Sequence, residues 1–192
     1  KEPLDNLWNS LMSVIDILQE PYKNITQEIF KTYEKKIRVI PENIEDLNPI
    51  RGGFLKHLVT ISKISLKISS FYPSMDKDLI LCGVLIHDIG KVKSINDKFQ
   101  DSYNDAGKLI GDVALGINIL QEAASSLKDF PERLLLQLEH IIISYGAWKG
   151  TDTIAPKFPE ALFIHYLCAL DSQINIMQDD IGSDLSIDAV ET

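Results

Sequence analysis

The sequence is short of the features that mark several classes of protein. Its 192 residues include only two cysteines, Cys82 and Cys168, so a disulfide-stapled scaffold is excluded. Lys and Arg total 19 against 28 Asp and Glu, and this formal net charge of −9 argues against a broad nucleic-acid-binding face. The longest apolar stretch, from Leu79 to His87, is too short to span a membrane.

An export signal, a low-complexity tract and an internal repeat are also missing from the sequence. We therefore expect a cytoplasmic protein with reduced cysteines and no membrane partner. The first residue is Lys1 rather than Met, as expected of a piece of a longer chain. Hydrophobic residues make up 45% of the sequence, which is enough for one core and excludes disorder as the main state.

Apolar residues recur at helical spacing along most of the chain, and no convincing set of strands is present. The expected fold class is therefore all-α. Proline and glycine divide the pattern, and Gly90 is expected to stop a central buried helix. Helices are expected from Leu4 to near Pro21, from 25 to 37, Phe54–Phe71, Leu79–Ile89, Asp105–Leu127, Pro131–Tyr145 and Pro159–Met177. The segments 41–51, Lys91–Asn104 and Gly146–Lys157 are expected to be loops.

Two of these helices have predicted core-facing sides. The helix that begins at Phe54 is expected to bury His57, Ile61, Ile64, Ile68 and Phe71. The helix that begins at Asp105 is expected to bury Leu109, Val113, Ile117 and Leu120.

Four histidines fall inside the expected helices among apolar residues: His57, His87, His140 and His165. A lone histidine in that setting is usually a hydrogen-bonded core residue. His87 differs because Asp88 follows it at the end of the most apolar helix, where an ionised carboxylate needs a partner. Asp171 has the same need in the last helix. Because the chain has only three arginines, a metal ion is a more attractive partner than an ion pair.

Three segments together resemble the HD superfamily of metal-dependent phosphohydrolases. They are Gly52-Gly-Phe-Leu-Lys-His57, Leu85-Ile-His-Asp-Ile-Gly-Lys91 and Asp171, in the order His…His-Asp…Asp. Two further segments, Gly111–Gly116 and Pro159–Asp171, are similar to the bacterial 3′–5′ exoribonuclease branch, in which an HD domain follows an OB-fold domain. The resemblance covers roughly residues 48–176 and includes no OB-fold.

The resemblance implies a single HD-domain helical bundle with two N-terminal helices packed on it. The expected organisation is an N-terminal helical extension (1–47), the HD domain (48–180) and an acidic tail (181–192). By position, the resemblance implies that His57, His87, Asp88 and Asp171 hold one divalent metal ion: Mn, Fe, Zn, Ni or Mg. The exoribonuclease branch often has two acids three residues apart here, and the first would fall at Cys168. If that acid is the usual ligand, the first site is altered in this chain.

The sequence departs from the same branch where further histidines hold a second metal. It has Gly111-Asp112 where the branch has Gly-His, and Ser144-Tyr145-Gly146 where the branch has Ser-His-His-Gly. His140, which matches the histidine before that motif, is retained. Asp112 and His140 are thus candidate second-site ligands, and Tyr145 is a candidate contact for phosphate or water. An incomplete second site is expected, which puts a two-metal mechanism in doubt.

The remaining candidates would act on a substrate phosphate, on water or on a base. Lys91 would place a positive charge beside the metal, and the alternative is a solvated lysine at a helix C-terminus. Asp88 and Asp112 are the acids that would take a proton from water, with the general base unassigned between them. Trp148 would stack a base, although an aromatic side chain folded onto the surface is the favoured interpretation. His165 is expected to be structural or to support a ligand.

Three hypotheses for the function stay open. The first is a phosphohydrolase or phosphodiesterase for a nucleotide or short single-stranded nucleic acid, because a surface of net charge −9 repels long double-stranded nucleic acid. The alternative is a degenerate HD domain with a structural, ligand-binding or partner-binding role and no catalysis. In the third, the two N-terminal helices bind a partner through the apolar stripe that includes Trp8, Leu11 and Met12. The alternative, which is favoured, is that this stripe packs on the core of the HD domain. The sequence does not define the oligomeric state.

Overall fold

The structure is a computed structural model of the chain, and it describes residues 3–44, 50–96, 102–145 and 154–188. The side chains of residue 176 and of residues 178–188 lie outside this description. Trp148, one of the candidate substrate contacts, falls in an undescribed segment.

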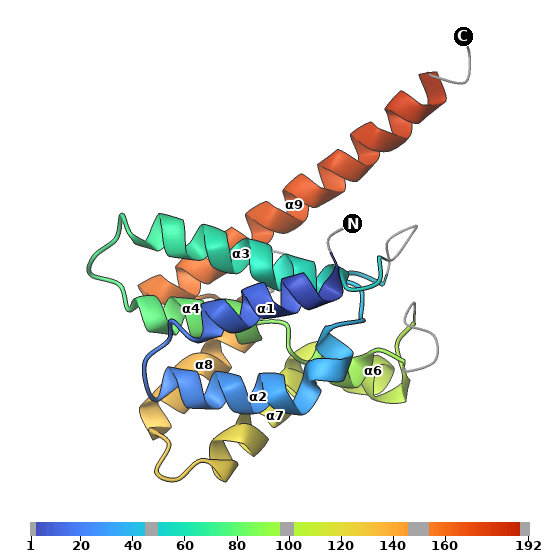
Figure 1. Cartoon of the computed structure of the whole chain (residues 1–192). Coiled ribbons are helices and arrows are strands. Elements are labelled where there is room, and N and C mark those ends of the chain that lie inside the picture. Colours follow the sequence, from blue (N-terminus) through green and yellow to red (C-terminus); the bar gives the residue numbers. More distant parts are fainter. Residues whose placement is uncertain (1–2, 45–49, 97–101, 146–153, 189–192) are drawn as a thin grey trace.

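Helices make up the architecture of the described part of the chain, where the β pairing is a single isolated bridge between Ile95 and Tyr103. This confirms the expected all-α class. The helices are α1 (Leu4–Ile15), α2 (Tyr22–Ile37), α3 (Gly53–Ser69), α4 (Lys77–Ile86), α5 (Lys91–Ser94), α6 (Asp105–Leu109), α7 (Asp112–Ser126), α8 (Glu132–Ser144) and α9 (Pro159–Asp188). Figure 1 shows α1 and α3 running along one side of α4, with α2, α7 and α8 on the other.

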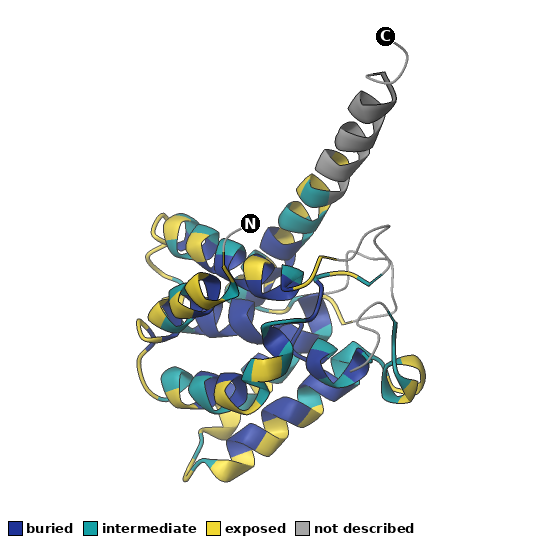
Figure 2. Ribbon diagram, turned by 45° about the vertical axis from the view of Figure 1, so that its right-hand side comes forward, coloured by how far each residue is buried: buried dark blue, intermediate teal, exposed yellow. Residues whose placement is uncertain are grey.

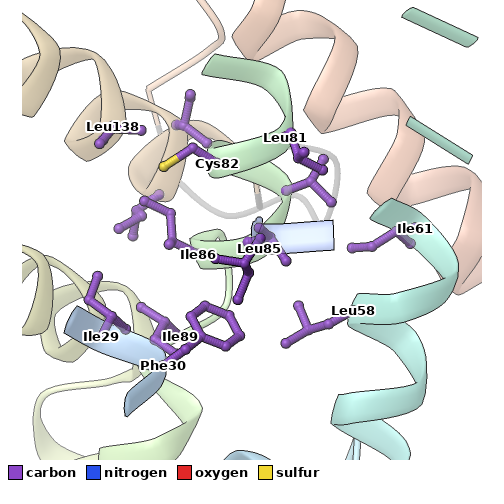
Figure 3. Packing of buried hydrophobic residues seen from close by; sticks show 14 of the residues in the cluster. Ile29, Phe30, Leu58, Ile61, Leu81, Cys82, Leu85, Ile86, Ile89 and Leu138 are labelled. Carbon is purple, nitrogen blue, oxygen red and sulfur yellow. The ribbon is translucent and has the colours of Figure 1, made fainter. Parts of the chain in front are cut away.

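The central element is α4, which is buried at every position from Leu79 to Ile86. It begins at Asp76, whose carboxylate caps the helix by accepting from the backbone N–H of Leu79 at 2.9 Å. Side chains from α2, α3, α8 and α9 pack around it. Figure 3 shows Phe30, Leu58 and Leu138 converging on α4 from three of these helices. An apolar surface all round is typical of a helix enclosed by others, as the sequence pattern predicts.

The N-terminal helices are part of this bundle. Trp8 and Leu11 are buried, and Met12 packs against the same core. Buried residues of α1 and α2 face inward in Figure 2, while their exposed residues lie outside. The stripe on α1 therefore packs on the chain's own core, and the hypothesis that it binds a partner is wrong.

The sequence pattern predicted that Gly90 ends the central helix, and this prediction is wrong. Helix α4 already ends at Ile86, and a turn through Gly90 leads into α5, inside the segment expected to be a loop. Gly90 has an ordinary helical φ of −56°. Its role is steric, because a Cβ atom at this position would lie 1.8 Å from the backbone oxygen of Asp112. The absent side chain lets the start of α7 approach the turn after α4.

Several expected helix limits and core positions are wrong. The helix expected over 105–127 is split between α6 and α7 at Gly111, whose φ of +82° interrupts the helical backbone. Leu109 at the end of α6 is consequently 85% exposed. Phe71 is 78% exposed because α3 ends two residues earlier. The first helix ends at Ile15, short of Pro21.

The last helix is longer than the sequence pattern predicts, because it continues to Asp188 and projects beyond the bundle in Figure 1. Its outer side carries exposed apolar side chains: Leu162, Tyr166, Leu170, Ile174 and Met177. Within the described residues, no helix combines the length and apolar character needed to cross a membrane.

We predict that Gly90→Ala lowers the free energy of unfolding by about 3 kcal/mol, because backbone atoms of α7 block the added methyl group. Gly83→Ala is the matched control. At Gly83 the nearest atoms are the terminal carbons of Ile164 and Ile141, which can rotate away. Urea unfolding of both variants checks this, and equal losses would contradict the steric role of Gly90.

Candidate metal centre

The candidate site lies where the turn after α4 meets α3, α8 and α9. His87 and Asp88 follow the buried end of α4, and backbone hydrogen bonds from Ile89 to Ile86 and from Lys91 to Asp88, both 3.1 Å, close the turn. His57 comes from the buried face of α3. Because α3, α4 and α9 contact one another, residues far apart in the sequence can share this site.

His57 is the meeting point of two carboxylates. Its Nδ1 atom lies 2.7 Å from Oδ2 of Asp171 and 3.2 Å from Oε1 of Glu42. The three potential ligand atoms all lie within 4.8 Å of one another. At an effective dielectric constant of 20, two carboxylates at such a distance repel by about 3 kcal/mol. A cation between them offsets that repulsion.

His87 is oriented by a backbone carbonyl. Its Nδ1 atom lies 2.7 Å from the oxygen of Val84, and since a carbonyl only accepts, Nδ1 carries the proton. Nε2 therefore keeps its lone pair, which is the arrangement of a metal-binding imidazole. Burial lowers the pKa of His87 to about 4, so the ring is neutral at physiological pH. The ring centroids of His57 and His87 are 5.5 Å apart.

Asp88 is buried and has a partner at each carboxylate oxygen. Oδ2 lies 2.5 Å from Nζ of Lys91, and Oδ1 accepts a hydrogen bond from the hydroxyl of Tyr145. Burial alone would raise the pKa of Asp88. The positive charge of Lys91, together with these hydrogen bonds, outweighs burial and holds the pKa well below its usual range. Asp88 is therefore a carboxylate at any working pH.

Lys91 is enclosed by the site rather than solvated. Its side chain is 15% exposed, and Nζ also donates to the backbone oxygen of Glu42 at 2.5 Å. Nζ lies 5.8 Å from the ring centre of Phe54. Burial favours loss of the proton, but the negative charge of Asp88 outweighs it and raises the pKa of Lys91. The alternative of a solvated lysine at a helix C-terminus is wrong, because Lys91 begins α5.

Tyr145 ties the end of α8 to the same cluster. Besides bonding Asp88, its ring stands edge-on to His87 with centroids 4.9 Å apart. Its backbone oxygen lies 3.1 Å from Nδ1 of His165, which is buried. Through this contact His165 helps to position Tyr145, which is consistent with a structural role. Burial raises the pKa of Tyr145 well above its usual value, so its hydroxyl stays a donor.

The other candidates differ in position. Asp112, in the first turn of α7, lies close enough for its charge to raise the pKa values of both Lys91 and Tyr145. The described contacts of His140 are with residues 157 and 158, and not with the cluster around Asp88. Its Nε2 accepts from the backbone N–H of Lys157 at 3.0 Å, and its ring lies beside that of Phe158. Cys168, where the exoribonuclease branch often has an acid, is buried on α9, and it is Asp171 that reaches His57.

Glu42 is the site residue that sequence reasoning missed. It lies in the segment before α3, which the sequence analysis treated only as a loop. The sequence feature that points to this segment is the glycine pair Gly52-Gly53. A Cβ atom on Gly53 would lie 2.9 Å from the backbone nitrogen of Glu42. The paired glycines thus allow this segment to lie against the start of α3.

Comparison with known proteins agrees with this geometry. The HD domain family model matches residues 54–171. The 3'-5' exoribonuclease YhaM of Bacillus subtilis (strain 168) is 29% identical over 177 residues, which is 91% of this chain and 56% of that protein. The YhaM proteins of Bacillus licheniformis and Bacillus pumilus are 28% and 27% identical, with the same coverage. No solved structure gives a significant match.

The chain thus spans little more than half the length of the curated relatives that it matches. The HD domain implies a divalent metal ion, and the donors present fit one. The close group of donor atoms is formed by Glu42, His57 and Asp171, and the nearby His87, outside that group, has a neutral ring whose Nε2 keeps its lone pair.

We predict that the metal-free protein loses stability as the pH falls from 6.5 to 4. Above pH 6.5 the His87 ring is neutral in both folded and unfolded chains, so its contribution is constant. Between 6.5 and its folded pKa of about 4, the unfolded chain alone takes up the proton, which costs about 3 kcal/mol of stability.

Denaturant unfolding with a chelator present, at several pH values, measures this loss. His87→Gln should flatten the pH dependence over this window. The loss of stability below about pH 4 should remain in His87→Gln, because there the unfolded chain protonates Asp88 while the folded chain, with its depressed pKa, does not. An unchanged slope in His87→Gln would show that other groups cause the loss.

Proposed function

Because the chain belongs to the HD domain family, we propose that it is a metal-dependent phosphodiesterase for a nucleotide or short single-stranded nucleic acid. The observation that carries this proposal is the pairing of His57 with Asp171 beside the neutral ring of His87. Asp88 follows His87 directly in the turn after α4, and the ring centroid of His87 lies 5.5 Å from that of His57. We propose His57, His87, Asp88 and Asp171 as ligands of one divalent cation.

A divalent cation in this place supplies Lewis acidity: it polarises a phosphoryl oxygen and makes a water molecule more acidic. The chain's own groups would do the rest. Lys91, enclosed beside Asp88, would offset negative charge on the phosphate. The Tyr145 hydroxyl would hold Asp88 in place. Asp88 is a poor proton acceptor because its pKa is so low, which favours Asp112 as the group that takes the proton.

One cation, rather than two, is the proposed content. A second cation would normally share a carboxylate with the first, and the ammonium group of Lys91, 2.5 Å from Oδ2 of Asp88, repels a second positive charge there. Each carboxylate oxygen keeps a further lone pair, so Asp88 can still bind the first cation. Two of the second-site positions suggested by the resemblance hold Asp112 and Tyr145. The metal's identity, among Mn, Fe, Zn, Ni and Mg, is for experiment to decide.

The substrate class rests on the relatives and on charge. The name of the Bacillus relatives, 3'-5' exoribonuclease YhaM, supports a phosphodiester substrate. The net charge of −9 disfavours long or double-stranded nucleic acid and favours a short substrate. The cytoplasm, where RNA and nucleotides are found, is the proposed compartment.

A second candidate function is a degenerate HD domain that binds a ligand or partner without catalysis. The saturation of Asp88 by Lys91 and Tyr145 favours it, because these contacts satisfy the carboxylate without any metal. The converging carboxylates at His57 oppose it. Groups that repel each other are costly to keep in a fold that has no use for a cation.

The test is elemental analysis of protein purified without a chelator or metal-affinity tag, followed by hydrolysis assays with short oligoribonucleotides and nucleotides. We expect about one equivalent of metal, and phosphodiesterase activity with that metal. His87→Ala and Asp88→Asn should each reduce activity by about 100-fold or more while retaining the helical circular dichroism spectrum.

Glu122→Gln is the control, since Glu122 is an exposed acid that pairs with Lys93 away from the cluster. It should keep full activity and metal content. Metal content near zero after incubation with Mn²⁺ would refute the proposed enzymatic function. Unfolding of His87→Ala on metal loss would instead indicate a structural ion.

A further inference from the structure

Glu42 belongs to the N-terminal part of the chain, outside the residues 54–171 that define the family match. Its carboxylate nevertheless contacts the candidate site, with Oε1 3.2 Å from Nδ1 of His57. The side chain is 29% exposed, so it borders the site on a side that solvent reaches. The metal centre and the N-terminal helices therefore meet at this residue.

The backbone around Glu42 is held firmly. The N–H of Gly52 donates to the oxygen of Val39 at 3.1 Å, and the N–H of Phe54 donates to the oxygen of Ile40 at 3.3 Å. Lys91 reaches the backbone oxygen of Glu42 from the opposite side. Glu42 thus contacts both halves of the site, through its backbone oxygen at Lys91 and its carboxylate at His57.

His57 cannot satisfy both of its carboxylate neighbours. Nδ1 carries at most one proton, yet Oε1 of Glu42 and Oδ2 of Asp171 both lie within hydrogen-bond distance of it. Two carboxylates this close repel each other, and the charge of Lys91 also interacts with Glu42. A cation coordinated by His57, Glu42 and Asp171 would offset the remaining repulsion.

We propose that Glu42 is a further ligand of the cation, so that the segment between α2 and α3 completes the metal centre. This inference rests on the proposed metal site. With Glu42 the donors are two imidazoles and three carboxylates, a set that suits a six-coordinate ion such as Mn²⁺. It is a poor match for Zn²⁺, which prefers four ligands. Glu42 is therefore the residue that sets cation preference.

A contrary role for Glu42 is possible on the same geometry: its carboxylate would stand where a substrate phosphate binds and so block the site. The two roles predict opposite effects of removing the charge. A ligand is needed for tight metal binding, whereas a block hinders turnover and leaves metal binding intact.

The experiment is a calorimetric titration of the metal-free chain with Mn²⁺, and separately with Zn²⁺, comparing wild type, Glu42→Gln and Glu122→Gln. For Glu42→Gln we expect the Mn²⁺ dissociation constant to rise by about 10- to 100-fold at unchanged stoichiometry. The Zn²⁺ constant should change less. Glu122→Gln removes the same charge from the surface and should match wild type. The electron paramagnetic resonance spectrum of bound Mn²⁺ should also change in Glu42→Gln.

Gly53→Ala tests the position of Glu42 without altering any ligand. The added methyl group would lie 2.9 Å from the backbone nitrogen of Glu42 and push this segment away from α3. Gly53 does not have a left-handed φ, so the cost of the change is steric, and because the blocking atom belongs to the backbone we expect some loss of stability as well. We expect weakened Mn²⁺ binding in the same direction as Glu42→Gln, with thermal unfolding of the metal-free protein as the check on folding.

The outcomes separate the two proposals. If wild type binds no Mn²⁺ and no Zn²⁺, the proposed function fails and the role of Glu42 fails with it. If wild type binds one Mn²⁺ and Glu42→Gln binds it as tightly, only the role of Glu42 as a ligand is refuted. Tight Mn²⁺ binding with faster turnover in Glu42→Gln would establish the blocking role instead.

Discussion

The buried negative charge of Asp88 is the constraint on which the rest of the site depends. An ionised carboxylate at the end of an apolar helix is stable only with partners, and removal of one partner of such a buried pair typically costs about 3–5 kcal/mol. Lys91 supplies the charge from α5 and Tyr145 supplies a hydrogen bond from the end of α8. The turn after α4 is therefore fixed by electrostatics as well as by backbone hydrogen bonds, and His87 is fixed with it.

The fold serves this constraint by bringing distant segments to one turn. Gly90 permits the backbone of α7 to approach, which sets Asp112 near Lys91. Gly53 permits the segment before α3 to approach, which sets Glu42 against His57. In both places a missing side chain allows a close backbone contact, and that contact places an acid in the site. The two N-terminal helices are consequently part of the same core and not an appendage.

The sequence predicts what is local and misses what tertiary packing decides. His87, Asp88 and Lys91 form one short motif directly after a strongly apolar helix, so their proximity follows from the sequence. Asp171 was predicted to need a cation because it lies among apolar residues of the last helix, but nothing in its spacing fixes its distance from His57. Glu42 was missed because a loop has no periodicity that shows which way it faces. The split between α6 and α7 was missed because apolar spacing continues through Gly111, where the backbone departs from the helix.

The same contacts explain why a site without the usual second-site histidines is still chemically coherent. In a two-metal site a second cation would provide positive charge beside Asp88. Here the ammonium group of Lys91 provides that charge permanently, because it is enclosed and its pKa is raised by Asp88. Tyr145 supplies the hydrogen bond at the other oxygen. A covalently attached charge requires no metal loading, and beside His57 the carboxylates of Glu42 and Asp171 converge, where the proposed cation would offset their repulsion.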